Sequence, residues 1–551
     1  MNKKFLFVFS IITLLICSDV AYAQKYWVKF KNKKGTPYSI GNPSAYLSVK
    51  SIVRRATHGI SIDSTDLPVT PAYVSQVDAV PGVTVLYRSK WINGIAISVT
   101  NTVALTTINT FTFVQTTAAV ERYKVTIPEI EKNYIDKNSS SQKTANPLAY
   151  NYGNSFNQAT MIGADCMHNA GFRGQGITIA VLDAGFLNVH IDNIFDSLFM
   201  QNRLIGTYDF VAGDTMVFED HSHGAMCLST MAGIGTGSNT IIGTAPKANY
   251  WLLRTEDVGS ETPSEEYNWI RGIEFADSVG ADISTTSLGY TTFDNSSQSH
   301  TYSQLNGKTS PMSIASTMAS RKGIIVLTAA GNEGGSSWNF ISVPADADSI
   351  ITVGAVDASY NKAGFSSFGP TSDGRIKPDL CSQGAAAWVC NTGCFPGNGT
   401  SFATPILAGG VACLLQSKPF ANPMQIINAL KASATNSAVP NNNIGWGVPK
   451  LCAAKSGTLL TVSNNVEQDE SFVRVYPNPF NNTLNISFNG IANTNAEFVI
   501  TDIIGKVVFA GKITNTAQTN SYSEFESLKP GVYFINISTG QSISTKKIVK
   551  Q

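Results

Sequence analysis

Short, continuous apolar runs recur through the middle of the chain. The clearest lie in GITIAVLDAG (176–185), KGIIVLTAAGN (322–332) and SIITVGAV (349–356), and each is rich in β-branched residues. Strands that are covered on both faces have this pattern, and helical patterns lie between them here. The region from about 144 to 457 is therefore expected to be an α/β domain, with a parallel sheet and helices on both faces.

Two regions with other patterns flank this one. Residues 24–143 start with a strand-like YWVKF, continue into a helical LSVKSIVRRA, and then carry strand patterns in VTVLYRSKW and GIAISV. They predict a small α+β unit that ends in a polar, Ser-rich linker. Residues 474–551 alternate apolar and polar positions between Asn, Gly, Thr and Pro turns, which predicts a small β-sandwich. The polar stretch 458–473 is the expected linker to it.

Residues 1–23 have the pattern of a secretory signal peptide. Two lysines precede an apolar run from Phe5 to Cys17, and AYA at 21–23 fits an A-x-A cleavage site. The run is too short to span a membrane, and no later stretch reaches the roughly 18 uninterrupted apolar residues of a transmembrane helix. We therefore expect an exported protein that is secreted or held at the cell surface.

Charge and cysteine content narrow the function classes. The formal net charge is +1, so the composition gives no sign of a nucleic-acid partner. Of eight cysteines, Cys17 falls in the expected signal peptide, and the odd number that remains implies at least one thiol that is free or paired with another molecule. Cys390 and Cys394 bracket a short loop and are the best candidates for a disulfide. The other pairings stay open.

Polar residues follow the apolar runs at three places. Asp183 ends IAVLD and Asn332 ends IIVLTAAGN, and such strand ends share one edge of a parallel sheet. Ser401 stands in GTSFATP, where Pro405 suits the first turn of a helix. A helix N-terminus there could stabilise an oxyanion. Taken singly, each residue has a simpler role: Asp183 as a strand-end cap or metal ligand, Asn332 as a turn residue, Ser401 as an N-cap.

The stretch DHSHGAMC holds two of the six histidines. His223 is followed at once by Gly224 and a helix-like run, and it shares a helix face with Cys227 four residues later. His221 lies before this helix and is expected to point elsewhere, which makes it the weaker candidate for a base. A zinc site from the two histidines and an acid is the alternative, but there is no second ligand cluster and no H-E-x-x-H.

Together, these motifs resemble those of the subtilisin-like serine peptidases. GTSFATP is similar to the family's G-T-S-x-A-x-P, Asp183 stands in D-x-G, His223 opens H-G and Asn332 ends A-A-G-N, in the family order of Asp, His and Ser. The resemblance implies a triad of Asp183, His223 and Ser401 with Asn332 as the oxyanion donor. It also implies that Ser287-Leu288-Gly289 is an edge segment that pairs with the substrate backbone.

The residue types suit these roles. A serine hydroxyl is a weak nucleophile until a base takes its proton, and a neutral imidazole can do so while a buried carboxylate orients it. The sequence departs from the family's usual HGTHVAG at Ala225 and Met226, and Ala184 replaces the usual hydroxyl residue after the acid. These changes surround the base rather than replace it. Cys227 occupies the place of a buried cysteine in proteinase K-like members, which implies sensitivity to mercurials.

The flanking regions carry resemblances of their own. Residues 24–143 look like the family's prodomain, which implies a folding template and inhibitor that Ser401 removes by cutting within about 122–147. Residues 474–551 resemble the type A sorting domain of the bacterial type IX secretion system, although a carbohydrate-binding or adhesive β-sandwich is the alternative. The residues that carry this second likeness are VYPNPF, LKPGVY and the closing KKIVK.

The expected function is endopeptidase hydrolysis of extracellular proteins. The expected partners are protein or peptide substrates, the chain's own prodomain and the type IX secretion machinery. No cofactor is required and no metal residue is assigned; structural calcium is common in the family, but its ligands are not legible here. A catalytically silent surface adhesin is the alternative. An esterase is disfavoured because GTSFA lacks the second glycine of G-x-S-x-G. Substrate preference stays open.

Overall fold

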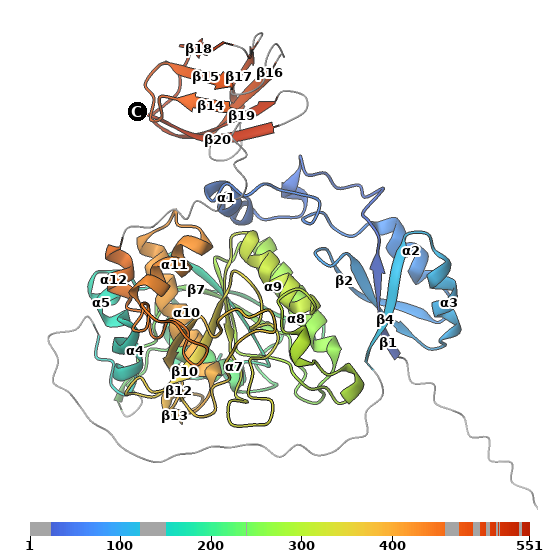
Figure 1. The fold of residues 1–551 in the computed structure, drawn as a ribbon, viewed down its shortest axis with the longest axis vertical. Helices are drawn as coiled ribbons and strands as arrows, with labels where there is room; N and C mark the ends of the chain where they lie inside the picture. Colours follow the sequence, from blue (N-terminus) through green and yellow to red (C-terminus); the bar gives the residue numbers. More distant parts are fainter. Residues whose placement is uncertain are drawn as a thin grey trace, which may run out of the picture.

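The computed structural model describes residues 24–121, 150–237, 240–457, 473–488, 496–502, 507–513, 516, 518–538 and 543–551. The expected signal peptide, the Ser-rich linker, the window 122–147 for self-cleavage and nearly all of the linker 458–473 lie outside the described residues. We refer to residues 24–121, 150–457 and 473–551 as the N-terminal, central and C-terminal units (Figure 1).

Seven parallel strands form the sheet of the central unit, in the order β11-β10-β9-β8-β5-β7-β6. Their bounds are β5 (Thr178–Asp183), β6 (Leu204–Asp209), β7 (Asn249–Arg254), β8 (Ile283–Thr286), β9 (Ile325–Ala329), β10 (Ile351–Val356) and β11 (Leu380–Gln383). Every residue of β5, β8, β9 and β10 is buried, because helices cover both faces. The predicted α/β fold class is confirmed.

The helices of the central unit divide into two layers. The bounds are α4 (Phe156–Ile162), α5 (Ala164–Asn169), α6 (Asp196–Met200), α7 (His223–Ala232), α8 (Pro263–Val279), α9 (Pro311–Arg321), α10 (Thr400–Ser417), α11 (Pro423–Ser433) and α12 (Leu451–Ser456). Ile179 and Val181 of β5 pack in one core with α7 and α10, whereas Ala180 and Leu182 pack in the other with α8 and α9. Alternate residues of each strand thus serve opposite faces.

Helix α10 runs through the middle of the layer that also contains α7. It is long and apolar enough to cross a membrane by length and composition, but 89% of it is buried inside the protein. Gly409 faces Thr244, whose Oγ1 would lie 2.1 Å from a Cβ at that position, so only glycine fits this close approach. The small residues of α10 therefore serve packing within the core.

Two disulfides hold the central unit. Cys390–Cys394 joins β12 (Ala387–Cys390) to β13 (Cys394–Gly397) in a hairpin, as expected from the short spacing. Cys166–Cys452 joins α5 to α12 across 286 residues of sequence. The remaining cysteines, Cys227, Cys381 and Cys413, are free and buried. The odd cysteine count is thereby explained by buried thiols.

The N-terminal unit is a four-stranded antiparallel sheet in the order β2-β3-β1-β4, with three helices. The bounds are β1 (Gln24–Phe30), α1 (Val49–Thr57), α2 (Pro71–Asp78), β2 (Val83–Ser89), β3 (Gly94–Val99), α3 (Val103–Thr110) and β4 (Val114–Glu121). The four segments expected from the sequence form β1, α1, β2 and β3. The unit packs against α8, where Trp27 stacks on Tyr267 with ring centroids 4.6 Å apart.

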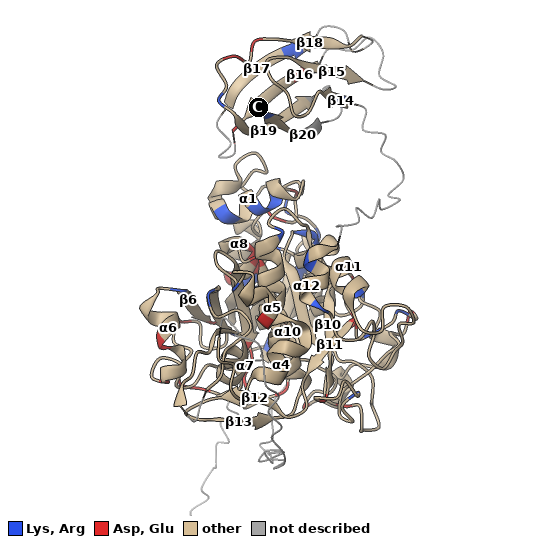
Figure 2. Cartoon of the chain, turned by 90° about the vertical axis from the view of Figure 1, so that its left-hand side faces the viewer, with Lys and Arg blue, Asp and Glu red and all other residues tan. Residues whose placement is uncertain are grey.

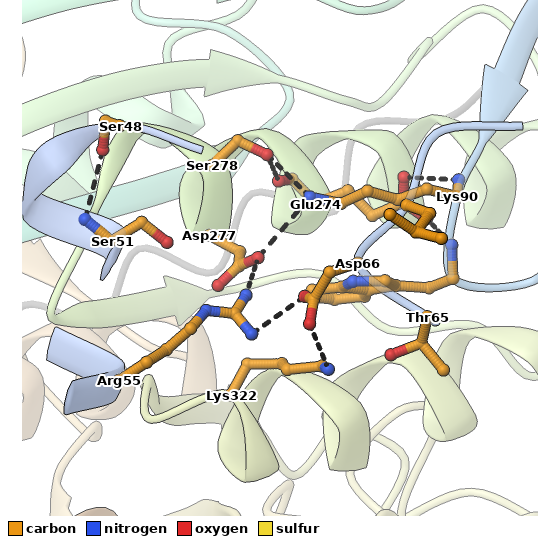
Figure 3. A network of polar contacts seen from close by, with 12 residues as sticks. Ser48, Ser51, Arg55, Thr65, Asp66, Lys90, Glu274, Asp277, Ser278 and Lys322 are labelled. Atoms are coloured by element: carbon orange, nitrogen blue, oxygen red, sulfur yellow. Dashed lines mark hydrogen bonds and ion pairs between the residues drawn. The ribbon is translucent and has the colours of Figure 1, made fainter. Parts of the chain in front are cut away.

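A buried network of charges joins the N-terminal unit to the central unit (Figure 3). Arg55 of α1 contacts Asp277 of α8 at 2.6 Å and Asp66 at 2.8 Å. Lys322, just after α9, contacts Asp66 at 2.9 Å, and Arg54 contacts Asp277 at 2.5 Å. In Figure 2 the blue segments of α1 mark its basic residues, and the helix lies near the end of α8. No side chain in these pairs is more than 4% exposed, so both units exclude water from their charges.

A second buried carboxylate receives the turn between β2 and β3. Glu274 of α8 accepts hydrogen bonds from the backbone N–H groups of Lys90 (3.0 Å) and Trp91 (2.9 Å) and from the hydroxyl of Ser89. Burial raises the pKa of Glu274, and the positive charge of Lys90 opposes that shift. Helix α8 thus presents two acidic side chains, Glu274 and Asp277, to the N-terminal unit.

The C-terminal unit consists of two antiparallel sheets, with strand orders β14-β15-β18 and β17-β16-β19-β20. The bounds are β14 (Val473–Tyr476), β15 (Leu484–Phe488), β16 (Ala496–Thr501), β17 (Val507–Ile513), β18 (Asn520–Tyr522), β19 (Gly531–Ser538) and β20 (Ile543–Lys550). Ile486 and Phe498, one from each sheet, are buried in a shared core. The unit is the antiparallel sandwich that the alternating pattern predicts.

Replacing Arg55 by Met tests the buried network. In a Ser401→Ala background, which removes the hydroxyl that the sequence predicts to cut the chain, Arg55→Met should lower the free energy of unfolding by about 3–5 kcal/mol, because removing one member of a buried ion pair leaves an uncompensated charge. Lys50→Met is the matched control: Lys50 also lies on α1 and contacts Asp282 at 2.7 Å, but its side chain is 40% exposed. It should cost less than about 1 kcal/mol. Equal losses in urea unfolding would contradict this account.

Candidate active site

Asp183 and His223 form a direct contact at the carboxyl edge of the sheet. Asp183 is the last residue of β5 and is fully buried, and α7 begins at His223. The Oδ1 atom of Asp183 lies 2.7 Å from Nδ1 of His223 and also accepts the backbone N–H of Ala184 at 2.8 Å. A Cβ at Gly224 would lie 2.4 Å from the carbonyl oxygen of Gly185. Glycine after the histidine therefore lets α7 approach the end of β5.

The electrostatics favour a charged imidazole. Burial disfavours the imidazolium form, but the Asp183 carboxylate outweighs it, and the pKa of His223 is raised well above its ordinary value. Cys227 lies one turn below, with its Sγ 3.9 Å from Nδ1 of His223. Burial raises the pKa of this thiol, so it is protonated at neutral pH and Asp183 supplies the negative charge. Because Nδ1 faces Asp183, Nε2 is the ring nitrogen left to exchange a proton.

Ser401 lines the same cavity as His223. The cavity has a volume of about 260 Å³. The residues that line it and that the sequence had singled out are His221, His223, Ser287, Leu288, Gly289, Asn332 and Ser401. The hydroxyl of Ser401 donates to the carbonyl oxygen of Ser287 at 3.1 Å in this structure. If His223 is to accept the proton of Ser401, the hydroxyl therefore has to turn from Ser287 to Nε2 of His223.

Pro405 does not lie in the first turn of its helix, contrary to the expectation. Helix α10 begins at Thr400, so Pro405 is its sixth residue. Proline has no N–H group to donate to the carbonyl four residues earlier, which is that of Ser401. This carbonyl instead accepts the hydroxyl of Ser287 at 2.7 Å and the thiol of Cys227 at 3.4 Å. The proline thus frees a carbonyl that ties α10 to β8 and α7.

The side chain of Asn332 is oriented by Thr400. Its Oδ1 accepts the backbone N–H of Thr400 at 2.9 Å and the hydroxyl of Thr400 at 3.0 Å. With the oxygen held in this way, the amide group is free to donate into the cavity. The first N–H groups of a helix have no partner within the helix, so the backbone N–H of Ser401 is a second donor at the same place. Two donors of this kind can stabilise an oxyanion.

Thr400 has a structural role that the sequence did not reveal. Its hydroxyl contacts Asn332 and also accepts the backbone N–H of Gly331 at 3.3 Å. Position 400 directly precedes the serine in the G-T-S motif, and its place in that motif is the signal that the sequence offers. Its hydrogen bonds connect the end of β9 to the start of α10.

His221 lines the cavity, which corrects the expectation that it points elsewhere. Its Nδ1 accepts the backbone N–H of His223 at 3.3 Å, and the two rings lie 6.4 Å apart. The N–H of His223 is one of the unpaired donors at the start of α7, so His221 acts as a cap for that helix. This hydrogen bond helps to hold His223 in place.

Within the part of the chain that the structure describes, two sets of side chains could ligate a metal ion. One is Asp183, His223 and Cys227, whose donor atoms lie within 4.8 Å of one another; it does not include His221. Cys227 binds metal as a thiolate, and its raised pKa disfavours that form. The other set is Glu256, Glu261 and Glu265. Burial raises the pKa of Glu256 to about 7 and that of Glu265 to about 10, so this set carries less charge than its composition implies.

Comparison with known proteins identifies the family of the central unit. Subtilisin NAT of Bacillus subtilis subsp. natto is 30% identical over 334 residues, which is 59% of this chain and 77% of the relative. Subtilisin DY of Bacillus licheniformis is 30% identical over 284 residues, 50% of this chain and 90% of the relative. The subtilase family model matches residues 174–447. The chain belongs to the subtilase family. It is a serine-type endopeptidase.

The flanking units of this subtilase match other models. A peptidase S8 propeptide domain of Bacteroidota matches residues 25–149, and a secretion system C-terminal sorting domain matches residues 474–551. The sorting domain indicates export, and thus a secreted or cell-surface protein. Among solved structures, MycP1 with its N-terminal propeptide removed is similar with a TM-score of 0.43 and 22% identity, over 55% of this chain and 97% of that chain.

The raised pKa of His223 predicts the pH dependence of activity. The imidazole accepts a proton only when it is neutral, so kcat/KM should rise with pH through an apparent pKa above the usual value of about 6.5. Asp183→Asn removes the charge that raises this pKa. It should lower the apparent pKa and reduce kcat by about 10⁴-fold, because the imidazole then takes the wrong tautomer. Asp192→Asn, in a loop outside the cavity, is the control and should change neither the apparent pKa nor kcat. An unshifted pH profile in Asp183→Asn would contradict the assignment of this pKa to His223.

Cys227 predicts sensitivity to mercurials. A mercury atom on its sulfur would displace both His223 and the carbonyl of Ser401, so a small organomercurial should abolish peptide hydrolysis. Cys227→Ala should stay active in the presence of the reagent. Cys413→Ala is the matched control, because Cys413 is also free and buried but contacts Thr244 instead. Continued inhibition of Cys227→Ala would show that another group reacts.

Proposed function

We propose that this subtilase hydrolyses peptide bonds of extracellular proteins with Ser401 as nucleophile, His223 as base and Asp183 as its orienting acid. The observation that supports this most directly is the 2.7 Å contact between Asp183 and His223, in a cavity that His223 shares with Ser401 and Asn332. Ser287-Leu288-Gly289 lines the same cavity beside Ser401 and offers its backbone to the substrate.

The first half of the reaction acylates the serine. The hydroxyl of Ser401 attacks the peptide carbonyl carbon, and its proton passes to Nε2 of His223. Asp183 stabilises the resulting imidazolium through Nδ1. The C–N bond then breaks, His223 returns the proton to the leaving amine, and an ester between Ser401 and the substrate acyl group remains. Water repeats the sequence in the second half: His223 takes its proton, the ester breaks, and Ser401 recovers its hydrogen.

Negative charge develops on the substrate oxygen in both halves. The side-chain amide of Asn332 and the backbone N–H of Ser401 are the proposed donors to it. Thr400 holds the oxygen of Asn332 at 2.9 and 3.0 Å, so the amide is oriented before substrate arrives. One such donor contributes about 2.7–4 kcal/mol to transition-state stabilisation. Subtilisins need no cofactor for these steps, and the family commonly carries structural calcium.

The flanking units serve maturation and export in this proposal. We assign residues 1–23 as signal peptide, 24–143 as prodomain, 144–457 as peptidase domain, 458–473 as linker and 474–551 as sorting domain. The buried contacts of Arg54 and Arg55 with Asp277 support a prodomain that binds tightly to the fold it templates. Ser401 would cut within about 122–147. The partner for export is the type IX secretion machinery.

A labelling experiment tests the proposed catalytic role of Ser401. A fluorophosphonate probe reacts with activated serines, so the purified protein should become labelled and lose its peptidase activity in proportion. Ser401→Ala should lose both. It should also stay uncleaved between the prodomain and the peptidase domain, because no nucleophile remains.

The alternative is a catalytically silent adhesin. An unlabelled wild-type protein that hydrolyses no peptide would favour it, although the complete set of Asp183, His223, Ser401 and Asn332 argues against that outcome. Ser417→Ala is the matched control: Ser417 ends the same helix, and its hydroxyl bonds the carbonyl of Leu414, away from the cavity. This variant should label and mature normally. Normal cleavage of Ser401→Ala would show that a second protease does the processing.

A further inference from the structure

A buried arginine ends the strand beside the one that carries Asp183. Arg254 is the last residue of β7, which lies between β5 and β6, and it pairs in register with Asp183 of β5 and Asp209 of β6. Its side chain is only 8% exposed, and Nη1 contacts Oδ2 of Asp209 at 2.7 Å. A guanidinium stays charged and is costly to bury without partners, so its contacts show which segments it holds.

One partner of Arg254 is the turn that follows the acid. The Nε–H group of Arg254 donates to the carbonyl oxygen of Ala184 at 3.2 Å. The N–H of Ala184 donates to Oδ1 of Asp183 at 2.8 Å, so residue 184 is fixed on both sides. The chain then turns at Gly185, whose φ of +148° is rarely adopted by residues with a side chain. Arg254 therefore holds the point at which the chain leaves β5.

Another partner is the segment that leads to the base. Nη1 of Arg254 lies 3.3 Å from Oδ2 of Asp220, which directly precedes His221. His221 in turn accepts the backbone N–H of His223. This segment also packs on the turn after the acid, since a Cβ at Gly185 would lie 2.6 Å from the backbone nitrogen of His221. One cation thus joins the turn after the acid to the segment before the base.

The carboxylate of Asp183 is held through a single oxygen. Its Oδ2 is buried and has no hydrogen-bond partner among the described residues, whereas Oδ1 contacts both the N–H of Ala184 and Nδ1 of His223. A shift of Ala184 therefore moves the oxygen that faces the base. Backbone hydrogen bonds between the two segments occur farther along, where the N–H of Leu187 donates to the carbonyl of His221 at 3.1 Å. Nearest the acid, the carbonyl of Ala184 is held by the arginine.

We propose that Arg254 is a positioning residue for the acid and the base. Its guanidinium fixes Ala184, whose N–H in turn fixes Oδ1 of Asp183. Its contact with Asp220 holds the segment before His223 in place. This inference rests on the proposed function, which gives the acid and the base their parts in the reaction. Arg254 lies outside the residues that line the cavity, so its loss acts on the imidazolium formed during the reaction rather than on substrate binding.

The test separates correct positioning from correct folding. Fluorophosphonate titration, carried to completion, counts the molecules with a reactive serine, and peptide hydrolysis then gives kcat per titrated site. Arg254→Met should lower kcat per titrated site by about 100-fold, which is the effect of misplacing a catalytic group by about 1 Å. KM should stay nearly unchanged, because the interaction that is lost matters in the transition state. A purely structural role would lower only the number of titrated sites.

Arg203→Met is the matched control. Arg203 is also buried and also donates to a backbone carbonyl, that of Ala248 at 3.0 Å, but it directly precedes β6 at the amino edge of the sheet. Its loss should reduce the number of titrated sites and leave kcat per site unchanged. An unchanged kcat per site in Arg254→Met would overturn the inference, and so would equal losses of kcat per site in the two variants.

Chemical rescue gives a second measurement. Arg254→Ala leaves space for a free guanidinium ion, so guanidinium chloride, far below the concentrations that unfold the protein, should raise kcat per titrated site. Sodium chloride at the same ionic strength should not, and equal effects of the two salts would contradict the inference.

A variant at the more exposed partner covers the case in which neither substitution of Arg254 titrates. Asp220 is 29% exposed, and Asp220→Ala breaks its contact with the arginine while the buried pair with Asp209 remains. It should titrate fully with a smaller loss of kcat per site, and an unchanged kcat would overturn the inference. Absence of both labelling and hydrolysis in the wild type would instead overturn the proposed function.

Discussion

The carbonyl group of Ser401 is the point on which the site depends. Pro405 leaves it without its helical partner, and Ser287 and Cys227 take that place from two other elements. One acceptor thereby joins the helix that carries Ser401, the segment that contains Ser287 and the helix that carries His223. An unpaired buried carbonyl is costly, so these three elements are held together by the requirement to satisfy it. The proline is a structural cause of the site's geometry.

The N-terminal unit is held by a different constraint. Its contacts with α8 bury whole ion pairs, and buried charges are tolerated only when each has a partner. Asp277 meets two arginines of α1, and Asp66 bridges Arg55 to Lys322. Departure of the unit separates these charges, and water must then hydrate each of them. The interface is thus stable while every buried charge has its partner. Once one ion pair separates, the favourable interaction energy of that pair is lost. This combination suits the proposed prodomain, which would first guide folding and later leave.

Much of this arrangement could be predicted from the sequence, because it follows from local patterns. Continuous apolar runs mark buried parallel strands, and Asp183 and Asn332 lie at strand ends where such sheets gather reactive groups. The remaining features depend on contacts between distant segments. The Cys166–Cys452 disulfide spans 286 residues, and no spacing rule predicts it. A proline after a serine motif suits the first turn of a helix, which is why the sequence predicts Pro405 there, whereas hydrogen bonds from distant segments to the carbonyl of Ser401 permit it one turn later.

The contacts of His221 and Ser342 could not be predicted from the local sequence either. Each looks unremarkable in its own stretch, since a second histidine or a serine in a loop carries no pattern. Their contacts depend on residues outside their own stretches or beside them in space. His221 accepts the N–H of His223, and the hydroxyl of Ser342 lies close to Gly289 and Gly331 because these residues lack side chains. Glycine 224 works likewise, by letting the base helix meet the acid. Close backbone approach at glycines therefore sets both the contact between Asp183 and His223 and the shape of the cavity beside Ser401, so both features share one physical origin.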